Sequence, residues 1–424
     1  MGTEAVFHSP LFLQDELASA VGHLLRTCQL FGVAPWNVEL FGKPKRNRWT
    51  RVVRALNGVY SASIIVAVCT ANLLHQSDAS SSHFFAIRTL YLCEDVTVTV
   101  ITILALVGCQ WLRRSYSKCA LQIVLLGTTL SRVGTEIGFE RVEASIFKAL
   151  LGTLLYSLTI VAIDLVRYFD HLSDFVCRTL LYTVPNVINV LALYQYFVLL
   201  WLIAYYYRVI NGQLKAFSRA TFHQKSHHNR KHVEVLFISP PYANDRANVL
   251  DVLRKAHLQL SELTAQANDC FGLLILFTTV SSFAVLTLQL FGVCKATTIQ
   301  AWTYDQTTKL AYVVLWIVLH GLKVLLVLYP CRSVQEERDR TGPILYTFIP
   351  SAVDYSINNA LTKFSSQLLH EKDRLMACGV IALDMTLVNT MVGALTTYLV
   401  ILIQFDSTFA QSAGGGSPNA SLHA

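Results

Sequence analysis

Charged residues are scarce in this chain of 424 residues. Asp, Glu, Lys and Arg together make up 14% of it, whereas 53% of the residues are hydrophobic. A soluble domain carries about 25% charged residues. The composition therefore excludes an ordinary soluble protein and predicts an all-α integral membrane protein.

Catalytic and metal-binding motifs are missing too. The ten cysteines form no CxxC pair, and no segment resembles a P-loop, a catalytic triad, a metalloprotease helix or a Rossmann fingerprint. We therefore expect no enzyme activity, no cofactor and no metal. The net charge of +7 is confined to a few short loops, which does not favour nucleic-acid binding.

A cleavable signal peptide is not visible, because the first 29 residues include Glu4, Asp15 and Glu16 and lack a continuous apolar core. The first transmembrane helix is expected to act as the targeting signal. The same 29 residues place Leu13, Leu17 and Leu24 at helical spacing. This spacing predicts an amphipathic helix at the cytoplasmic surface of the membrane.

Long apolar segments are what the chain has in abundance. A transmembrane helix needs about 20 mostly apolar residues, and seven segments qualify. The predicted spans are residues 55–74, 92–112, 149–169, 180–205, 271–293, 310–329 and 378–403.

Lys and Arg alternate strongly between the loops that join these spans. Of the 34 such residues, 28 fall on one side of the predicted membrane and five on the other, and residues 406–424 contain none. Cytoplasmic loops carry the excess of Lys and Arg. We therefore expect a cytoplasmic N-terminus and an extracellular C-terminus, which is opposite to a G-protein-coupled receptor.

This topology divides the chain into seven parts. They are a cytoplasmic N-terminal segment (1–54), transmembrane helices 1–4 (55–205), a cytoplasmic loop with an anchor helix (206–270), transmembrane helices 5–6 (271–329), a cytoplasmic anchor segment (330–377), the seventh helix (378–405) and an extracellular tail (406–424). The tail carries a glycosylation sequon at Asn419. Cys177 and Cys294 both fall in outer loops, where two unpaired thiols are favoured over a disulfide.

Polar side chains gather in the outer half of the predicted spans, where each needs a partner or water. Such a set beside aromatic rings suits a small polar ligand. The alternative is polar contact between helices and at the headgroup boundary. The candidate ligand-binding residues are Glu94, Asp95, Asp164, Asn189, Gln195, Thr287, Gln289, Tyr312 and Trp316.

Two further features lie on the last two predicted spans. Lys323 is expected to snorkel or to form a structural or gating ion pair with Asp384. On the seventh helix, Thr397, Ile401 and Gln404 share one face with Phe405. Four copies of this stripe around an axis would line a pore, whereas taken alone such a stripe is typical of ordinary helix packing.

The end of the seventh span also resembles a known family. Thr397 and Tyr398, five aliphatic residues, then Gln404 and Phe405 match the signature of the insect gustatory receptors. Their superfamily includes the insect odorant receptors. Further similar segments are Ala377-Cys378-Gly379 with Asp384 and Thr386, Tyr329-Pro330-Cys331, and the six residues 30–35.

The resemblance implies the insect chemoreceptor channel fold and a homotetramer or heterotetramer that acts as a ligand-gated nonselective cation channel for Na⁺, K⁺ and Ca²⁺. It places Thr397, Tyr398, Ile401, Gln404 and Phe405 at the pore and gate. It also implies a tastant in the outer pocket, the plasma membrane of a sensory neuron dendrite and contact with membrane lipid. The amino-acid sequence of the signature is closer to that of the fructose-receptor branch, so a sugar is expected, with bitter compounds as the alternative.

Two other functions fit seven apolar helices. A metabotropic receptor requires an extracellular N-terminus, which the charge asymmetry disfavours. A small-solute transporter could use the same intramembrane carboxylates, but the sequence shows no inverted repeats or broken short helices.

Overall fold

The computed structural model describes residues 10–34, 48–78, 85–111, 113–133, 137–226, 246–297, 304–348, 355–371 and 374–414. Within them, seven helices are long and apolar enough to cross a membrane. Their spans are Arg51–Leu74, Glu94–Trp111, Val142–Arg167, Leu172–Ser218, Arg246–Lys295, Gln306–Tyr346 and Thr386–Thr408. The prediction of an all-α membrane protein with seven spans is confirmed.

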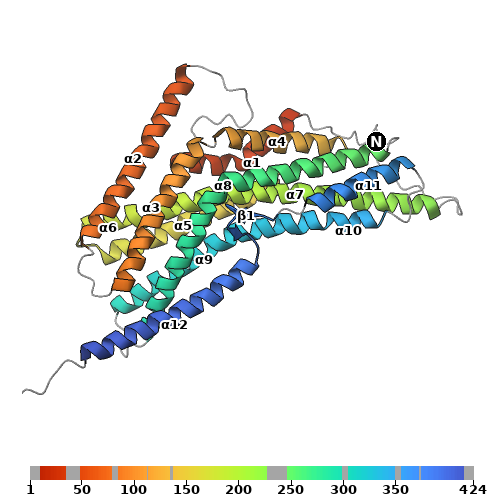
Figure 1. Ribbon diagram of the computed structural model, residues 1–424. Coiled ribbons are helices and arrows are strands. Elements are labelled where there is room, and N and C mark those ends of the chain that lie inside the picture. Colours follow the sequence, from red (N-terminus) through yellow and green to blue (C-terminus); the bar gives the residue numbers. More distant parts are fainter. Residues whose placement is uncertain are drawn as a thin grey trace, which may run out of the picture.

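The described elements follow one another as a helical bundle with one small hairpin (Figure 1). They are α1 (Pro10–Leu30), α2 (Arg48–Asp78), α3 (Phe85–Trp111), α4 (Arg113–Ser131), α5 (Glu140–Arg167), α6 (Leu172–Arg178), the π-helical turn η2 (Thr179–Thr183), α7 (Val184–Ser226), α8 (Arg246–Thr297), α9 (Tyr304–Asp339), α10 (Thr341–Tyr346), α11 (Tyr355–His370), β1 (Met376–Ala377), β2 (Ile381–Ala382) and α12 (Thr386–Gly414).

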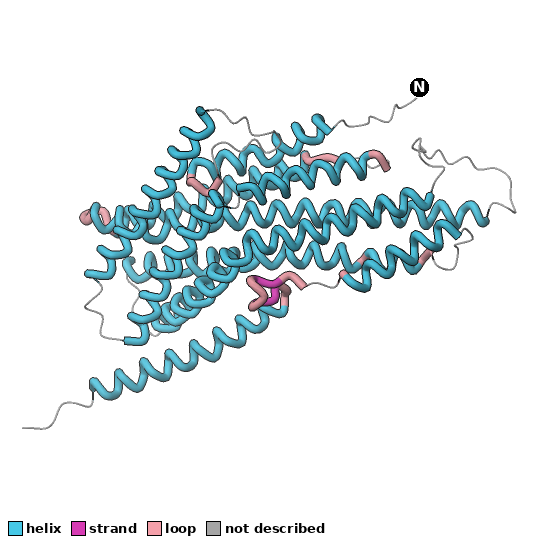
Figure 2. The backbone as a smooth tube through the Cα atoms, turned by 45° about the horizontal axis from the view of Figure 1, so that its top comes forward, coloured by secondary structure: helices cyan, strands magenta, loops and turns pink. Residues whose placement is uncertain are grey.

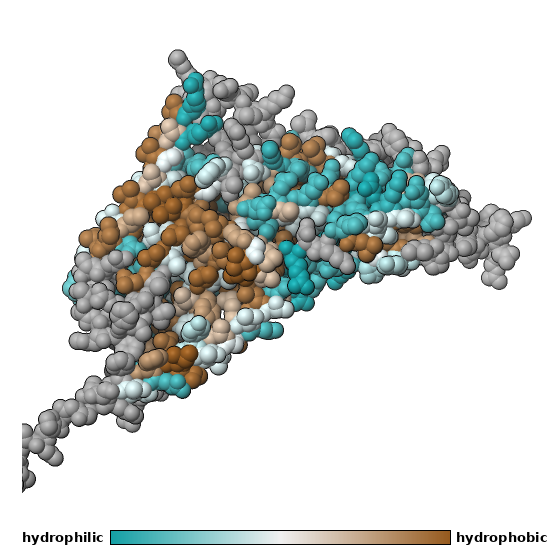
Figure 3. All heavy atoms as spheres, in the orientation of Figure 1, coloured by the Kyte–Doolittle hydropathy of each residue, from teal (hydrophilic) through white to brown (hydrophobic). Residues whose placement is uncertain are grey.

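Helices α7, α8 and α9 form the centre of the bundle and pack against one another. α8 is 52 residues long and α7 is 43. Both are therefore much longer than the roughly 20 residues that cross a membrane. Figure 2 shows these long helices side by side, with α12 set apart from the rest. Hydrophobic residues gather over α3, the end of α8 and α12, and hydrophilic ones over the opposite half around α4 (Figure 3).

The N-terminal helix α1 is amphipathic as predicted, but its surroundings differ from the prediction. Leu13, Leu17 and Cys28 are buried, and the helix packs against α4, α5 and α7. The apolar face is therefore covered by protein rather than by the membrane surface. Hydrophobic spacing alone cannot distinguish these two apolar environments.

A Schellman motif ends α1. The N–H of Val33 donates to Cys28 O at 2.8 Å and that of Gly32 donates to Gln29 O at 3.2 Å, while Gly32 adopts φ +75°. This is the hydrogen-bond pattern that a glycine in the left-handed region allows. The turn is then held from α2 and α3, where Tyr60 Oη donates to Leu30 O at 2.6 Å and Cys109 Sγ to Gly32 O at 3.3 Å.

The start of the seventh helix is a correction to the sequence prediction. The predicted span began at residue 378, but residues 376–382 form the antiparallel pair β1–β2. Cys378 and Gly379 have φ of 51° and 71°, and Val380 N–H donates to Ala377 O at 2.9 Å. These are the angles of a type I′ turn. α12 therefore begins at Thr386 and continues to Gly414, beyond the predicted end of the pore helix.

Buried polar contacts hold the other end of the bundle together. His257 on α8 is fully buried, with Nδ1 3.0 Å from Glu371 Oε2. Its ring stands edge-on to Tyr207 of α7 and Phe364 of α11. Helix α11 lies within the predicted anchor segment 330–377. The assignment of this region as a cytoplasmic anchor stays a prediction.

Two predicted sequence features can be placed at once. Cys177 and Cys294 are not joined by a disulfide, as favoured from the sequence. Asn419, the sequon, lies outside the described residues.

We expect Gly32→Ala to destabilise the protein. An added Cβ would meet Leu106 Cδ2 at 3.2 Å and Ser61 Oγ at 3.4 Å, in a conformation with φ +75°. The left-handed backbone alone costs a residue with a Cβ roughly 1–2 kcal/mol. The measurement is the melting temperature of the detergent-purified protein.

The matched control is Gly58→Ala in the interior of α2, where a Cβ meets nothing within 4 Å. Alanine is favoured over glycine there by up to about 1 kcal/mol. Equal melting temperatures for the two variants would contradict the strained cap.

Candidate functional site

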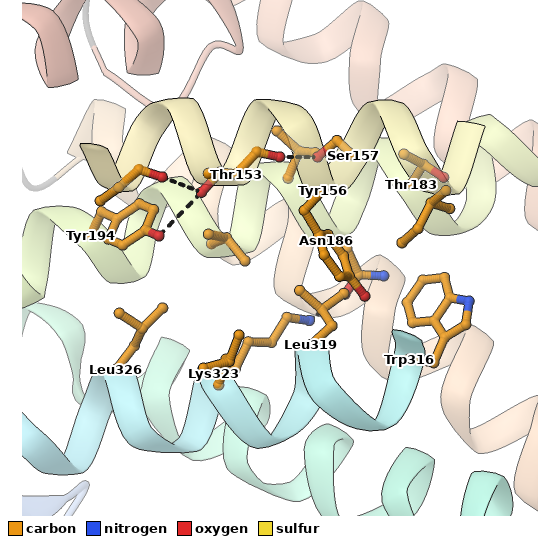
Figure 4. A pocket seen from close by; sticks show the side chains of 16 residues that line it. Thr153, Tyr156, Ser157, Thr183, Asn186, Tyr194, Trp316, Leu319, Lys323 and Leu326 are labelled. Atoms are coloured by element: carbon orange, nitrogen blue, oxygen red, sulfur yellow. Dashed lines mark hydrogen bonds between the residues drawn. The ribbon is translucent and has the colours of Figure 1, made fainter. Parts of the chain in front are cut away.

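A cavity of about 300 Å³ lies between α5, α7 and α9, with the last residue of η2 at its rim (Figure 4). Its polar lining comes from all of these elements. The polar or aromatic lining residues are Thr153, Tyr156 and Ser157 of α5, Thr183 of η2, Asn186 and Tyr194 of α7, and Trp316 and Lys323 of α9.

The cavity exists because small side chains on one helix face larger ones on two others. On α5 the lining residues follow helical spacing, and they begin with Ala149, Gly152 and Thr153. On α9 the same spacing presents Trp316, Leu319 and Lys323, among others. Residues three and four apart share one helix face, so each helix turns a single stripe to the cavity.

Lys323 is the one charged side chain among the residues that line the cavity. It is 2% exposed, and its Nζ donates to Asn186 Oδ1. The Asn186 amide donates in turn to Tyr182 O at 2.7 Å. Glu94 on α3 lies close enough to attract the ammonium group electrostatically. Lys323 is thus hydrogen-bonded to α7 and interacts electrostatically with α3.

The predicted pair between Lys323 and Asp384 is therefore wrong. Asp384 precedes α12, where its Oδ1 accepts hydrogen bonds from the N–H of Thr386, at 2.9 Å, and from the Thr386 hydroxyl. These bonds cap the helix and hold the pKa of Asp384 below its usual value. Lys323 and Asp384 serve separate elements because the last predicted span starts with a hairpin rather than with helix.

Glu94 and Asp95 are buried behind the wall of the cavity, at 5% and 2% exposure. Tyr182 Oη donates to Asp95 Oδ1 at 3.0 Å, and the Tyr182 ring stands edge-on to Trp316 with centroids 6.2 Å apart. The two carboxylates predicted as ligand contacts thus reach the cavity through Tyr182 and Lys323. They do not line it.

A second polar group adjoins the cavity at Trp316. Asp164 is 1% exposed, and neither of its carboxylate oxygens makes a hydrogen bond of good geometry with a described residue. The Arg167 guanidinium attracts it and also lies 5.1 Å from the centroid of the Tyr312 ring. Tyr312 stands edge-on to Trp316 at 5.9 Å. Two of the predicted ligand residues, Asp164 and Tyr312, are thereby brought together with a third, Trp316.

The remaining predicted ligand residues serve helix packing or lie apart from the cavity. Asn189 accepts a hydrogen bond from Thr278 of α8 at 3.1 Å. Gln195 donates to Cys28 Sγ and to Val33 O, both at 3.4 Å, and so ties α1 to α7. Thr287 donates to Phe283 O within its own helix, and Gln289 is half-buried outside the cavity lining. The sequence predicts how deep these residues lie in the membrane. That depth does not determine which neighbouring helix a side chain faces.

Five polar lining residues were missed by the sequence reasoning, namely Thr153, Tyr156, Ser157, Thr183 and Tyr194. The α5 residues could have been found, because Thr153, Tyr156 and Ser157 share one helix face with Asp164. Their short spacing within an apolar span is a polar stripe of the kind that faces protein rather than lipid.

Helix α12 presents two different faces. It packs against α8 through residues that include the buried Met391 and Leu402. The opposite face is exposed and carries Thr390, Thr397, Ile401 and Gln404. Three of these four side chains are polar, on a helix of membrane-spanning length.

The other two predicted gate residues differ in direction. Tyr398 stands edge-on to Phe283 of α8, with centroids 5.9 Å apart, so it turns towards α8 rather than towards the exposed polar face. Phe405 is 54% exposed beside that face. The next residue, Asp406, forms a salt bridge of 2.8 Å with Lys295, which fastens this part of α12 to α8.

Comparison with known proteins gives consistent results. A family described as 7tm chemosensory receptor matches residues 22–409. The Drosophila melanogaster protein named gustatory receptor 28b is 21% identical over 380 residues, which cover 85% of this chain and 80% of the relative. The gustatory receptor for sugar taste 43a of the same species is 28% identical over 166 residues, covering 39% of this chain and 38% of that relative.

Among solved structures, the chain is similar to an insect olfactory receptor of Machilis hrabei in complex with eugenol. The TM-score is 0.57 at 10% identity, with 92% of this chain and 99% of the other covered. At this identity the likeness concerns the fold.

We expect Asp384→Ala to loosen the start of α12, at a cost of about 1 kcal/mol for a lost helix cap. Because the folded protein lowers the pKa of Asp384, its stabilising charge is present above the unfolded pKa of about 4 and is lost as the pH falls through the lowered value. Hydrogen exchange at the first amides of α12 measures the effect.

Asp384→Asn is the matched control, since asparagine also caps helices well. If asparagine and alanine accelerated exchange equally at neutral pH, the capping role of Asp384 would be refuted.

Proposed function

The chain belongs to the 7tm chemosensory receptor family, and on that premise we propose that it is a tastant-gated nonselective cation channel. The protein is a multi-pass membrane protein. Each subunit would bind a small molecule in the cavity between α5, α7 and α9. Four subunits, of one kind or with related receptors, would surround a pore lined by α12.

The exposed polar face of α12 carries this proposal. In hydrocarbon a polar side chain is costly unless it meets a partner or water. The hydroxyl groups of Thr390 and Thr397 donate hydrogen bonds to carbonyl oxygens of the same helix. The Gln404 side chain, in contrast, is exposed. Lipid is an unfavourable neighbour for this face, and a water-filled pore between copies of the chain is a favourable one. Amide groups in such a pore can coordinate a cation, while Ile401 and Phe405 narrow it.

A continuous path of helix contacts links the cavity to this helix. α7 and α9 form two walls of the cavity and both pack on α8, and α8 packs on α12. A ligand opens the pore only to the extent that it binds the open state more tightly than the closed one. A shift of α9 or α7 around a bound ligand would reach α12 through α8.

The orientation follows from the charges in the sequence. The N-terminus is proposed to be cytoplasmic, with Na⁺, K⁺ and Ca²⁺ as permeant ions and the cavity in the outer leaflet. The ends of α7, α8 and α11 would then form the cytoplasmic anchor of the tetramer. Epitope tags on each terminus of unpermeabilised cells test this orientation against that of a metabotropic receptor.

The ligand class is the finer part of the proposal. Support for a sugar comes from the amino-acid sequence of the signature and from the relative named gustatory receptor for sugar taste 43a. A relative named gustatory receptor for bitter taste 66a is 26% identical over 165 residues, so the family likeness supports both classes. The two classes differ in how many hydrogen-bonding groups the cavity lining would have to supply.

We expect Gln404→Ala to change the conductance or the ion selectivity while the half-saturating ligand concentration moves little. The reason is that Gln404 faces away from the bundle, on α12, whereas the cavity is formed by other helices. The measurement is whole-cell current with G-protein signalling blocked, with reversal potentials in Na⁺, K⁺ and Ca²⁺.

Ile403→Ala is the control, because Ile403 is exposed one position away on a different face of α12. Permeation that is unchanged in Gln404→Ala, or equally changed in both variants, would refute the pore assignment. Saturable uptake of a solute without channel currents would favour the transporter instead.

A further inference from the structure

The walls of the cavity are mostly apolar. Half of the lining positions are alanine, glycine, valine, isoleucine or leucine, and the aromatic residues are Tyr156, Tyr194 and Trp316. A ligand that fills this space buries most of its surface against carbon. Apolar burial is favourable by roughly 25 cal/mol per Å², whereas each ligand hydroxyl left without a partner is costly.

Most polar groups of the lining already have partners inside the protein. Ser157 donates to Thr153 O at 2.8 Å and Thr153 to Ala149 O at 2.9 Å. Tyr156 donates to Leu315 O. Asn186 uses its amide N–H for Tyr182 O and its carbonyl for Lys323. These groups have little bonding capacity left for a ligand.

Among the other polar groups of the lining, Thr183 and Lys323 have hydrogen-bonding capacity left. The Thr183 hydroxyl is 7% exposed and makes no hydrogen bond with a described residue. The Lys323 ammonium has three N–H groups, of which Asn186 takes one. Both are donors that a buried acceptor would satisfy. In Figure 4 the Lys323 side chain runs along the cavity to Asn186, beside Tyr156.

Two carboxyl groups lie near Lys323 outside the cavity. Glu94 attracts the ammonium from α3, and the second carboxylate of that helix, Asp95, is bound by Tyr182. An anionic ligand would add a further negative charge to this surrounding. A neutral acceptor would use the free N–H groups without changing the charge balance.

We propose, resting on the proposed function, that the cavity takes a compact neutral ligand with an apolar body and one carbonyl-type oxygen. The oxygen accepts a hydrogen bond from Lys323, and the apolar body lies against Trp316 and the aliphatic walls. Lys323 is thereby the residue that determines specificity. A sugar is a poor fit, because its several hydroxyl groups would find few open partners.

The test measures binding and current separately. Full-length protein in lipid nanodiscs is titrated with a series of aryl ketones that begins with acetophenone, each paired with the alkene of the same shape (α-methylstyrene for acetophenone). Fructose and benzoate are titrated in parallel. The readout is the ligand-induced shift in melting temperature, and the same compounds are perfused over cells under voltage clamp.

In the wild-type protein we expect each ketone to bind about tenfold more tightly than its alkene, because only the ketone accepts a hydrogen bond from the buried Lys323. Lys323→Met should remove this preference while alkene binding is kept. Lys118→Met is the matched control, since Lys118 is exposed on α4, and it should preserve the preference.

Gly152→Leu tests the location without touching a charge. Gly152 lines the cavity and an added Cβ there meets nothing within 4 Å, so the variant should fold, fill the cavity and lose binding of both ketones and alkenes. Ketone binding that persists in Gly152→Leu would overturn the site. This variant and the wild-type comparison decide the matter even where Lys323→Met fails to fold.

The outcomes also separate this inference from the channel proposal. Equal binding of ketone and alkene, or tighter binding of benzoate or fructose, overturns the ligand class. If fructose then evokes current, the channel proposal holds although the proposed ligand class is wrong. Ketone binding without current in surface-expressed protein supports the ligand class and counts against the channel.

Discussion

Polar side chains in an apolar helical bundle need hydrogen-bond partners. In the described residues, these side chains differ in how many of their hydrogen bonds are made within the subunit. Gln195 and Asn189 have partners, and they join α7 to α1 and α8. Around the cavity the bonding is incomplete, since the Thr183 hydroxyl has no partner among the described residues. On α12 the polar face turns away from the bundle altogether. The groups that the subunit leaves unsatisfied mark the places where a ligand and a neighbouring subunit are expected.

The central position of α8 explains how such separate places belong to one mechanism. This single helix contacts α3, α7 and α9 around the cavity, α11 at one end and α12 at the other. α12 is fastened to it by buried side chains along one face and by the Lys295–Asp406 salt bridge. At the hairpin, Asn268 of α8 donates to Met376 O at 2.8 Å. A displacement of α8 relative to its neighbours must therefore alter both the cavity wall and the support of α12.

The sequence predicted the seven spans because hydropathy and length are properties of each segment alone. It did not predict which neighbour a polar residue meets, because that depends on helix rotation and packing. Gln195 was grouped with the ligand-binding residues but bonds to α1, and Lys323 was paired with Asp384 instead of Asn186. The hairpin before α12 was missed since its residues are apolar and continue the hydropathy of the span. Ala377-Cys378-Gly379 shows the turn only once the positive φ values are known.

The π-helical turn η2 shows why the cavity itself was the hardest part to predict. Val184 N–H bonds to Thr179 O, five residues back, so this turn holds one residue more than an α-helical turn. The extra residue changes the direction of every side chain before it relative to those after it. Tyr182 can therefore face Asp95 on α3 while Thr183 and Asn186 line the cavity. A projection with 3.6 residues per turn across residues 179–184 assigns these side chains to the wrong faces. The feature that brings Asn186 to Lys323 is thus the one that helical periodicity cannot show.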